Sequence, residues 1–257
     1  MQNRILPLEG VRNFRDFGGY VSRHGGTVKA GHLYRSGHHA EATEADITKL
    51  HQLNIALQAD LRRPDERERM VGKWTGEAVI THEGGRESEA PHQRFLKQME
   101  ASPEIADQWM NEYYIHAPFK PHHTAMFKDW FQGLAIIDGA GLVNCAAGKD
   151  RTGILCALTH HVLGVNESDI FADYELTNIA ANVDERLEGA RDYFNNRLGK
   201  NYEADVYRPF MGVNRRYLET ALSSIKDQCG SVETYLTDHL GVDEALQSQI
   251  VGRLVGD

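Results

Sequence analysis

The sequence predicts an α/β fold, in which helices flank a central, largely parallel sheet. Two observations support this class. Short apolar segments that are typical of strands alternate with helical patterns as far as residue 162, and helical patterns dominate the remainder. A strand at residues 142–143 also continues directly into a loop of small residues and then a helix, and open α/β sheets bind their ligands at such strand ends.

Length and composition indicate one globular domain over residues 1–257. The chain has 41% hydrophobic and 25% charged residues, which is ordinary for a soluble protein, and it is long enough to bury a sizeable core. The formal charge of -9 argues against a nucleic-acid partner bound through a broad basic face, and against a polybasic membrane anchor.

The lack of a recognisable targeting segment and the small number of cysteines predict a cytoplasmic protein. No apolar run approaches the roughly 18 residues that a membrane-spanning helix needs, so we expect no stable membrane insertion. Residues 1–10 lack the apolar stretch of a signal peptide. Three cysteines cannot form a closed disulfide framework. The oligomeric state is not indicated by the sequence.

Several segments have the pattern of strands. They are residues 14–21, 28–34, 55–61, 78–82 and 142–143. Gly25 and Gly26 lie between the first two segments and favour a turn, which predicts an antiparallel hairpin. The segment 55–61 has the apolar run of a buried strand, and 78–82 is weaker.

Helix starts can be predicted from capping residues. Thr43 and Asp46 resemble a capping box, which opens a helix that buries Ile47 and Leu50. Ser102 precedes Pro103, a combination typical of a cap followed by the first helical residue.

Apolar side chains at helical spacing predict two buried helices. One carries an aromatic stripe typical of core packing, made of Phe127, Trp130, Phe131 and Leu134. The other follows the loop of small residues and ends at Gly164. Later helices are expected to start near Ser168, Asn214, Ser231 and Asp243.

A cysteine and an arginine six residues apart, Cys145 and Arg151, bracket the loop between strand and helix. Backbone N–H groups in such a loop converge on one point and bind an anion. Three small residues let the backbone close around a tetrahedral oxyanion: Ala146, Ala147 and Gly148. Arg151 adds a planar fork for two phosphate oxygens. The same positive field favours the thiolate of Cys145, so one site binds a phosphate and supplies the nucleophile that attacks it.

The rest of the loop supplies the other groups that such chemistry needs. An acid must protonate the leaving oxygen and a base must then activate water, and Asp150 is the candidate for both. Its alternative role is that of a helix N-terminal charge, which the macrodipole also favours. Thr152 could donate a hydrogen bond to the Cys145 sulfur, and Lys149 would add positive charge for a polyanionic substrate.

Residues 145–153, CAAGKDRTG, resemble the signature C-x-x-G-K-D-R-[ST]-G of the atypical bacterial tyrosine and lipid phosphatases. Other segments match this family in order along the chain. They are 13–19 (NFRDFGG), 34–36 (YRS), 60–62 (DLR) and 230–241 (GSVETYLTDHLG). The resemblance covers most of the chain, and the loop motif is highly specific.

The resemblance implies a cysteine-phosphatase fold and an enzyme that needs no metal or cofactor. Its substrate would be a phosphorylated protein or a phosphoinositide, with phosphotyrosine foremost and phosphoserine or phosphothreonine also possible. The aspartate in the loop, here Asp150, would be the general acid. Some members of this family cover the site with a helical lid, and residues 86–121 lie where such an insertion would fall.

One residue departs from the family pattern. Histidine usually precedes the nucleophile, and here the residue is Asn144, which can form hydrogen bonds but cannot carry charge. We expect Asp60 and Arg62 to brace the loop from a neighbouring strand end, and Arg15 and Asp16 to be structural.

Other classes of protein are less compatible with these residues. A rhodanese-like sulfurtransferase also places a cysteine in an anion-binding loop, and a pseudophosphatase would bind phosphate without hydrolysing it. The 13 histidines do not suggest a metal site, because no H-E-x-x-H spacing occurs and adjacent histidines rarely converge on one ion. Cys156 is expected to be packed in the helix after the loop.

Overall fold

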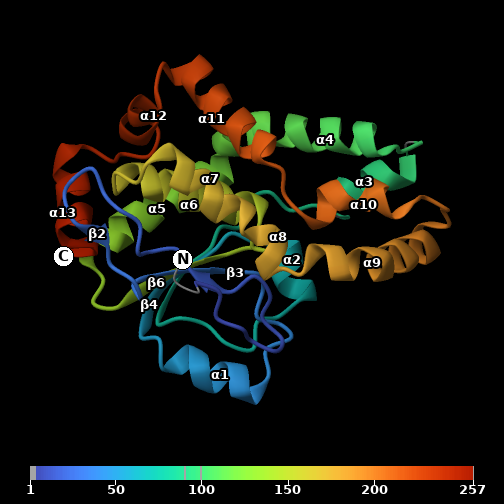
Figure 1. Cartoon of the computed structure of the whole chain (residues 1–257), viewed down its shortest axis with the longest axis horizontal. Coiled ribbons are helices and arrows are strands. Elements are labelled where there is room, and N and C mark those ends of the chain that lie inside the picture. Colours follow the sequence, from blue (N-terminus) through green and yellow to red (C-terminus); the bar gives the residue numbers. More distant parts are fainter. Residues whose placement is uncertain (1–3, 90, 99, 257) are drawn as a thin grey trace.

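The computed structural model describes residues 4–89, 91–98 and 100–256 and contains a five-stranded sheet with helices on both faces (Figure 1). The strand order is β1-β3-β6-β4-β5. The last four of these strands are parallel, and β1 pairs antiparallel with β3 at one edge. The strands are Arg15–Asp16 (β1), Leu33–Ser36 (β3), Ile55–Asp60 (β4), Ala78–Ile80 (β5) and Ala140–Asn144 (β6). The predicted α/β class with a largely parallel sheet is confirmed.

The predicted hairpin near the start of the chain also forms. The Phe17 N–H donates to the Leu33 carbonyl over 2.8 Å, and the turn contains Gly25 and Gly26 with φ of +92° and +71°. The regular strands are shorter than predicted. A pairing that the sequence analysis did not predict joins Thr27–Val28 (β2) to Val255–Gly256 (β7) in a separate two-stranded sheet.

The helices account for most of the remaining chain. They are Glu44–His51 (α1), Pro64–Arg69 (α2), Pro91–Gln98 (α3), Pro103–His116 (α4), the 3-10 turn Ala117–Phe119 (η1), Pro121–Ile136 (α5), Asp150–Val162 (α6), Glu167–Glu175 (α7), Thr177–Ala180 (α8), Val183–Leu198 (α9), Ala204–Met211 (α10), Arg215–Cys229 (α11), Val232–Asp238 (α12) and Glu244–Leu254 (α13). None of the helices in the described ranges is both long and apolar enough to cross a membrane.

Most predicted helix starts are confirmed by their capping hydrogen bonds. The side chains that accept from the first turn are Thr43, Ser102, Asn214, Ser231 and Asp243. The start predicted near Ser168 has its cap two residues earlier, at Asn166. The helix after the loop ends as predicted, because Gly164 adopts φ of +70° just beyond α6.

The two faces of the sheet carry unequal layers. In Figure 1, α1 lies alone on one side, and α5, α6 and α7 lie on the other. Leu142 and Val143 are consecutive in β6 and belong to the apolar clusters on opposite faces, as strand geometry requires. The larger cluster contains the buried aromatic residues of α5, so their predicted role in the core is confirmed. Trp130 also donates its indole N–H to the Thr159 hydroxyl over 3.0 Å.

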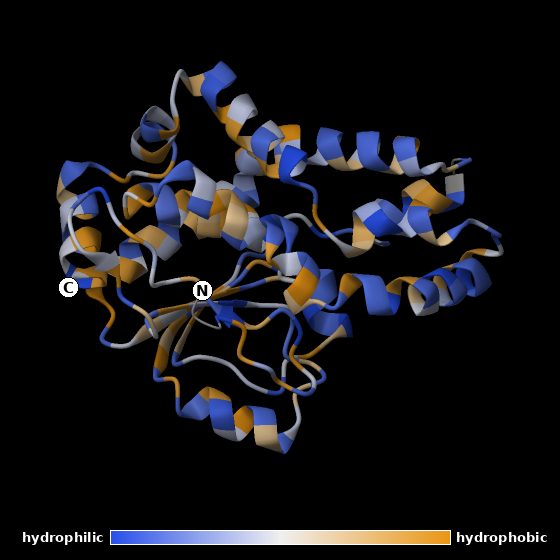
Figure 2. Ribbon diagram, in the orientation of Figure 1, coloured by the Kyte–Doolittle hydropathy of each residue, from blue (hydrophilic) through white to orange (hydrophobic). Residues whose placement is uncertain are grey.

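Four helices form a separate layer that projects beyond the sheet, which we call the helical extension: α3, α4, α9 and α10 (Figure 1). They share their own apolar cluster, which includes Phe95, Leu96, Leu187 and Tyr207. Hydrophilic residues predominate on α9 in Figure 2. The segment 86–121, predicted as a lid, supplies two of the four helices of the extension, α3 and α4. The other two, α9 and α10, come from a distant part of the chain.

Candidate active site

The loop of residues 145–149 lies at the carboxyl end of the central strand. It joins Asn144, the last residue of β6, to Asp150, the first residue of α6. β6 lies between β3 and β4, so the ends of both neighbouring strands flank the loop. Cys145 is buried, with 2% of its surface exposed.

The carbonyl groups of the loop are tied to the surrounding protein. The Asn13 side-chain amide donates to the Gly148 carbonyl over 2.8 Å, and the Arg35 guanidinium donates to the same oxygen over 3.1 Å. The His38 N–H donates to the Ala146 carbonyl over 3.2 Å. Within the described ranges, no hydrogen bond uses the N–H groups of residues 146–152 as donors. These N–H groups thus remain available, as an anion-binding loop requires.

Gly148 is required by the backbone of this loop. Its φ is +69°, in the left-handed region that favours glycine. A Cβ atom there would lie 2.3 Å from the Ser36 carbonyl oxygen, which belongs to the neighbouring strand β3. No other residue would let the loop pack this closely against the sheet.

A buried ion cluster supports the loop from behind. The Arg35 Nη1 atom lies 2.6 Å from Asp173 Oδ2, and Arg15 Nε lies 3.3 Å from Asp173 Oδ1. Burial alone would raise the pKa of Asp173, but the two arginines outweigh it and lower the pKa to about 2. The carboxylate therefore stays ionised and holds both guanidinium groups. Arg15 has the structural position that its motif predicted.

Arg151 is held by a carboxylate that the sequence analysis missed. Its Nη1 and Nη2 atoms donate to the two oxygens of Glu66 over 2.6 and 3.0 Å, and Nη1 also donates to the Leu61 carbonyl. Glu66 lies in the first turn of α2, where it also accepts from the Arg63 N–H. Burial would raise the pKa of Glu66, but Arg151 and Arg63 lower it to about 2. Both partners are charged, and the guanidinium is fixed beside Cys145.

Asn144 belongs to a fully buried polar network. Its Oδ1 accepts from Gln58 Nε2 over 2.8 Å, and its Nδ2 donates to Asp60 Oδ1 over 3.1 Å. Asp60 also accepts from Arg62, whose Nη2 atom lies 2.7 Å from Oδ2. Arg62 in turn donates to the Met70 carbonyl over 2.5 Å. Among the residues that the structure describes, Asp60 thus bonds to the residue before Cys145 and Arg62 bonds to Asp60, and neither lines the cavity.

Asp150 is anchored through one of its oxygens. The Tyr114 hydroxyl donates to Oδ1 over 2.7 Å, and the Lys149 ammonium lies 3.2 Å from the same oxygen. Tyr114 lies in α4 and its hydroxyl is also 2.7 Å from that of Tyr174 in α7. The side chain of Asp150 is 20% exposed and lines the same cavity as Cys145.

Lys149 connects the loop to the helical extension. It is 4% exposed, and its Nζ donates to the Pro209 carbonyl over 3.0 Å and to the Gly212 carbonyl over 2.9 Å. These carbonyls lie at the end of α10. The Lys149 ammonium, which was predicted to attract a polyanionic substrate, therefore also donates hydrogen bonds that hold the end of α10. Lys149 still borders the cavity.

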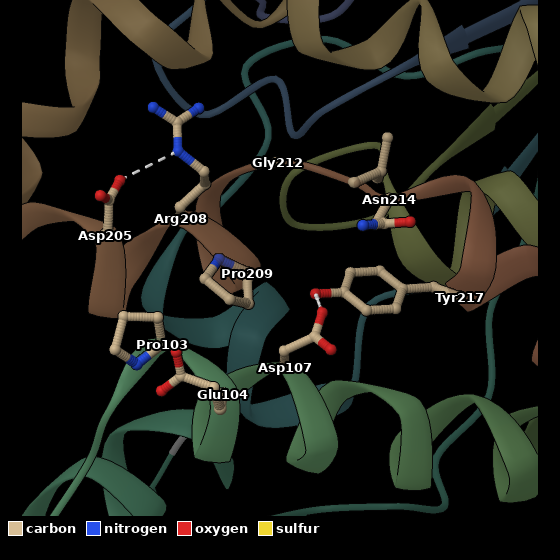
Figure 3. Close-up of a pocket in the computed structure, with 10 residues that line it drawn as sticks. Pro103, Glu104, Asp107, Asp205, Arg208, Pro209, Gly212, Asn214 and Tyr217 are labelled. Atoms are coloured by element: carbon tan, nitrogen blue, oxygen red, sulfur yellow. Dashed lines mark hydrogen bonds and ion pairs between the residues drawn. The ribbon is translucent and has the colours of Figure 1, made fainter.

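A second hollow, of about 640 Å³, lies on the outer side of this junction (Figure 3). Pro209 and Gly212 border it, together with Asp107 and Tyr217. Figure 3 shows the Tyr217 hydroxyl directed at Asp107, a hydrogen bond of 2.6 Å. Cys145 and Arg151 do not line this hollow, so it is separate from the candidate site.

The hydrogen bond considered for Thr152 is not formed in this structure. Its hydroxyl oxygen is buried and has no hydrogen-bond partner among the residues that the structure describes. The Cys145 sulfur is therefore not bonded to this hydroxyl. Thr152 is fully buried in the first turn of α6, beneath the loop rather than at its mouth.

The loop forms the floor of a cavity of about 350 Å³. Aromatic side chains of the helical extension make its walls, namely Trp109, Tyr113 and Phe210. Lys120 also lines it, with its ammonium 4.8 Å from the centre of the Tyr113 ring. His92 borders the cavity, and burial lowers its pKa to about 4, so its ring is neutral at pH 7.

The remaining cysteine near the site is inert. Cys156 lies in α6 with 1% of its surface exposed, and burial raises its pKa to about 12. It therefore remains a thiol. In the described part of the chain, no three histidine, cysteine, aspartate or glutamate side chains are grouped so that they could hold a metal ion.

The fold and this site define a cysteine-dependent phosphatase, with a cysteine and an arginine in one anion-binding loop at the end of a central parallel strand. The family model for the tyrosine phosphatase family matches residues 6–256. The chain belongs to the tyrosine phosphatase family, and the resemblance drawn from its loop motif is confirmed.

Three relatives carry phosphatase names. A "putative tyrosine-protein phosphatase" of Cupriavidus necator is 30% identical over 249 residues, which cover 93% of this chain and 85% of that protein. The triple specificity protein phosphatase PtpB of Mycobacterium tuberculosis is 26% identical, over 98% of this chain and 99% of its own length. A tyrosine-protein phosphatase of Nostoc commune is 28% identical, over 82% and 70%.

Proposed function

We propose that this protein hydrolyses phosphate monoesters in two steps through a phosphocysteine at Cys145. The observation that carries the proposal is the placement of Cys145 and the Glu66-bound Arg151 in one cavity. The loop that forms the floor of this cavity has N–H groups that donate to no residue in the described ranges. Arg151 and these N–H groups would hold the phosphoryl oxygens, and their charge would stabilise the transition state.

In the first step, the Cys145 thiolate attacks phosphorus and the bond from phosphorus to the leaving oxygen breaks. Asp150 gives its proton to that oxygen, so an alcohol or phenol departs. In the second step, water attacks phosphorus, its proton passes to Asp150, and the S–P bond breaks with its electron pair returning to sulfur. Phosphate leaves, and both residues regain their starting states.

The preferred substrate is proposed to be phosphotyrosine in a protein. The aromatic walls at Trp109, Tyr113 and Phe210 offer surfaces on which a phenyl ring can pack. Two of the relatives above are named tyrosine-protein phosphatases and one is named a triple specificity phosphatase, so phosphoserine, phosphothreonine and phosphoinositides stay in the substrate panel. Lys120 would favour substrates with further negative charge, because no ion pair engages its ammonium among the described residues.

We further propose that the protein works as a single domain in the cytoplasm. Its three cysteines are free thiols in the structure, and the proposed reaction needs a reduced Cys145.

The helical extension is proposed to act as the lid, because α3, α4 and α10 supply cavity walls above the loop.

The test is to compare Cys145→Ser with Cys229→Ser, which changes a half-exposed cysteine in α11 away from the cavity. We expect Cys145→Ser to abolish hydrolysis of an aryl phosphate in the presence of a chelator and yet to bind phosphate, and Cys229→Ser to keep native turnover. Near-native activity of Cys145→Ser would refute the mechanism.

Two further assays separate the alternatives. Wild-type protein that binds phosphate without any turnover would be a pseudophosphatase, and turnover of thiosulfate with cyanide would indicate a sulfurtransferase. Values of kcat/KM over phosphopeptides and inositol lipids would rank the substrates.

A further inference from the structure

The two carboxylate oxygens of Asp150 have different surroundings. Oδ1 accepts a hydrogen bond from the Tyr114 hydroxyl and lies 3.2 Å from the Lys149 ammonium. Oδ2 accepts no hydrogen bond from any residue that the structure describes. Because Asp150 lines the cavity and is partly exposed, Oδ2 is the oxygen that remains available for proton exchange.

Tyr114 is a hydrogen-bond donor that does not change its protonation state. It is fully buried in α4, and burial, followed by the nearby charge of Asp150, raises its pKa well above its usual value. Its single proton is directed at Asp150 Oδ1, so Tyr174 must be the donor in the bond between the two hydroxyls. Tyr114 therefore keeps Oδ1 as an acceptor whether Asp150 is ionised or protonated.

We propose that Tyr114 is a positioning residue that reserves Oδ2 of Asp150 as the atom that carries the catalytic proton. This inference rests on the proposed function. When Asp150 is protonated, the proton is on Oδ2, from which it passes to the leaving oxygen as the bond to phosphorus breaks. In the second step, Oδ2 takes the proton of the attacking water. Tyr114 exchanges no proton and acts only through Asp150.

The helix that anchors Asp150, α4, also forms part of the cavity wall that would face the substrate. Tyr113, the residue before Tyr114 in α4, lines the cavity, as do Trp109 and Met110 one turn earlier. A substrate that packs against these side chains therefore touches the helix that anchors Asp150. Correct placement of the leaving group and of Oδ2 would depend on the same element.

The test is Tyr114→Phe, measured on two aryl phosphates with different leaving groups. Phenyl phosphate has a basic leaving group and needs the acid, and we expect its kcat/KM to fall at least about 10-fold, within the range of general-acid effects. p-Nitrophenyl phosphate needs little protonation, and its kcat/KM should change less than about 2-fold. In an Asp150→Asn background, Tyr114→Phe should cause no further loss, because the residue acts through Asp150.

The matched control is Tyr235→Phe. Tyr235 is also fully buried, and its hydroxyl donates to the Pro118 carbonyl over 2.6 Å away from the cavity. This control should leave the ratio of the two kcat/KM values unchanged. If Tyr114→Phe does not fold, Tyr174→Phe is the second variant, because the Tyr174 hydroxyl bonds to that of Tyr114 and so acts on Asp150 indirectly. We expect it to lower kcat/KM for phenyl phosphate by a smaller factor and to leave kcat/KM for p-nitrophenyl phosphate unchanged.

Equal losses on both substrates, or a further loss in the Asp150→Asn background, would overturn the inference and leave the phosphatase proposal intact. Failure of the proposed function itself would appear instead as unchanged activity in Cys145→Ser.

Discussion

Arg151 depends on Glu66 for its orientation, and this pair connects two parts of the chain that lie 85 residues apart. The carboxylate takes up two of the guanidinium donors and presents the group beside Cys145. A charge-assisted hydrogen bond of this kind contributes about 1.5–3 kcal/mol. The position of Arg151, which is proposed to bind phosphate, is thus set by a residue outside the loop that precedes it.

Glu66→Gln should lower kcat/KM about 10-fold or more, because the amide keeps the shape but loses the charge that holds Arg151. Its effect on stability should depend on pH. The folded-state pKa of Glu66 is about 2 and lies below its usual 4.5. The stabilisation by the carboxylate is therefore fully present above pH 4.5 and is lost as pH falls through 2.

Urea unfolding of the wild type and of Glu66→Gln at several pH values measures the contribution of the Glu66 carboxylate to stability. The difference in unfolding free energy should be constant above pH 4.5 and should shrink at lower pH. A difference that stays the same down to pH 2 would show that the carboxylate charge does not contribute.

Asn144 shows where single-residue reasoning from the sequence was incomplete. The motif comparison treated it as a histidine that has lost its charge. In the structure, the Asn144 amide oxygen accepts a hydrogen bond from Gln58, and its amide nitrogen donates one to Asp60. All three side chains are buried. A side chain with one donor and one acceptor suits this place, and that requirement depends on Gln58 in a different strand.

At the level of single elements, the loop requires a glycine that can approach β3 closely. Gly148→Ala should abolish phosphate binding and activity, because both its φ of +69° and the 2.3 Å approach to Ser36 oppose a Cβ atom. The control is Gly199→Ala, at φ of +64° with no atom within 4 Å of the added Cβ. It should cost only about 1 kcal/mol of backbone strain.

Phosphate binding by calorimetry and thermal unfolding of the two variants distinguish these effects. If Gly148→Ala and Gly199→Ala lose the same stability and both bind phosphate, the close packing of the loop against β3 is not essential.

Lys149 holds the end of α10 through two carbonyl groups. Lys149→Met should keep the apolar stem and remove both hydrogen bonds, so α10 should open more often. Limited digestion with chymotrypsin measures this opening at Phe210, and we expect cleavage at least about 10-fold faster than in the wild type. Unchanged cleavage would mean that α10 is held by its apolar contacts alone.

Helix caps explain which elements could be predicted. Ser102, Asn214, Ser231 and Asp243 place a side-chain oxygen on the first turn, and these starts were found from the sequence. α9 begins after Asn182, which has φ of +49° and no side-chain cap. α10 follows Glu203 and also lacks one. Without caps, the start of neither helix could be placed, although this part of the chain was expected to be helical.

At the scale of the whole molecule, the chain contains a large core around the sheet and a smaller one in the helical extension. The local pattern predicted the sheet and the position of the loop between a central strand and a helix. The roles of the loop residues stay predictions, and the hydrogen bond considered for Thr152 is not formed. The local pattern could not predict contacts between distant segments, such as Glu66 with Arg151 or Tyr114 with Asp150, because these depend on how the helices pack.

Leu96→Ala should open the helical extension without unfolding the sheet. Leu96 is fully buried in the smaller core, and a cavity there costs about 2–5 kcal/mol. Hydrogen exchange should rise in α3, α9 and α10 only. Leu158→Ala, an equally buried change in α6, should instead raise exchange across the larger core. Increased exchange in the sheet of Leu96→Ala would show that the two cores unfold together.

The burial of Cys156 also determines how the enzyme responds to peroxide. A nucleophilic cysteine that is oxidised to a sulfenic acid can be rescued when a nearby thiolate forms a disulfide with it. Cys156 is shielded, and its pKa of about 12 keeps it protonated, so it cannot serve as that resolving partner. We expect mass spectrometry after peroxide treatment to find oxygen added at Cys145 and no Cys145–Cys156 disulfide, and the opposite result would contradict this. Without a resolving thiol, protection of the Cys145 sulfenic acid from further oxidation would have to come from external thiols or from a sulfenamide formed with a backbone nitrogen.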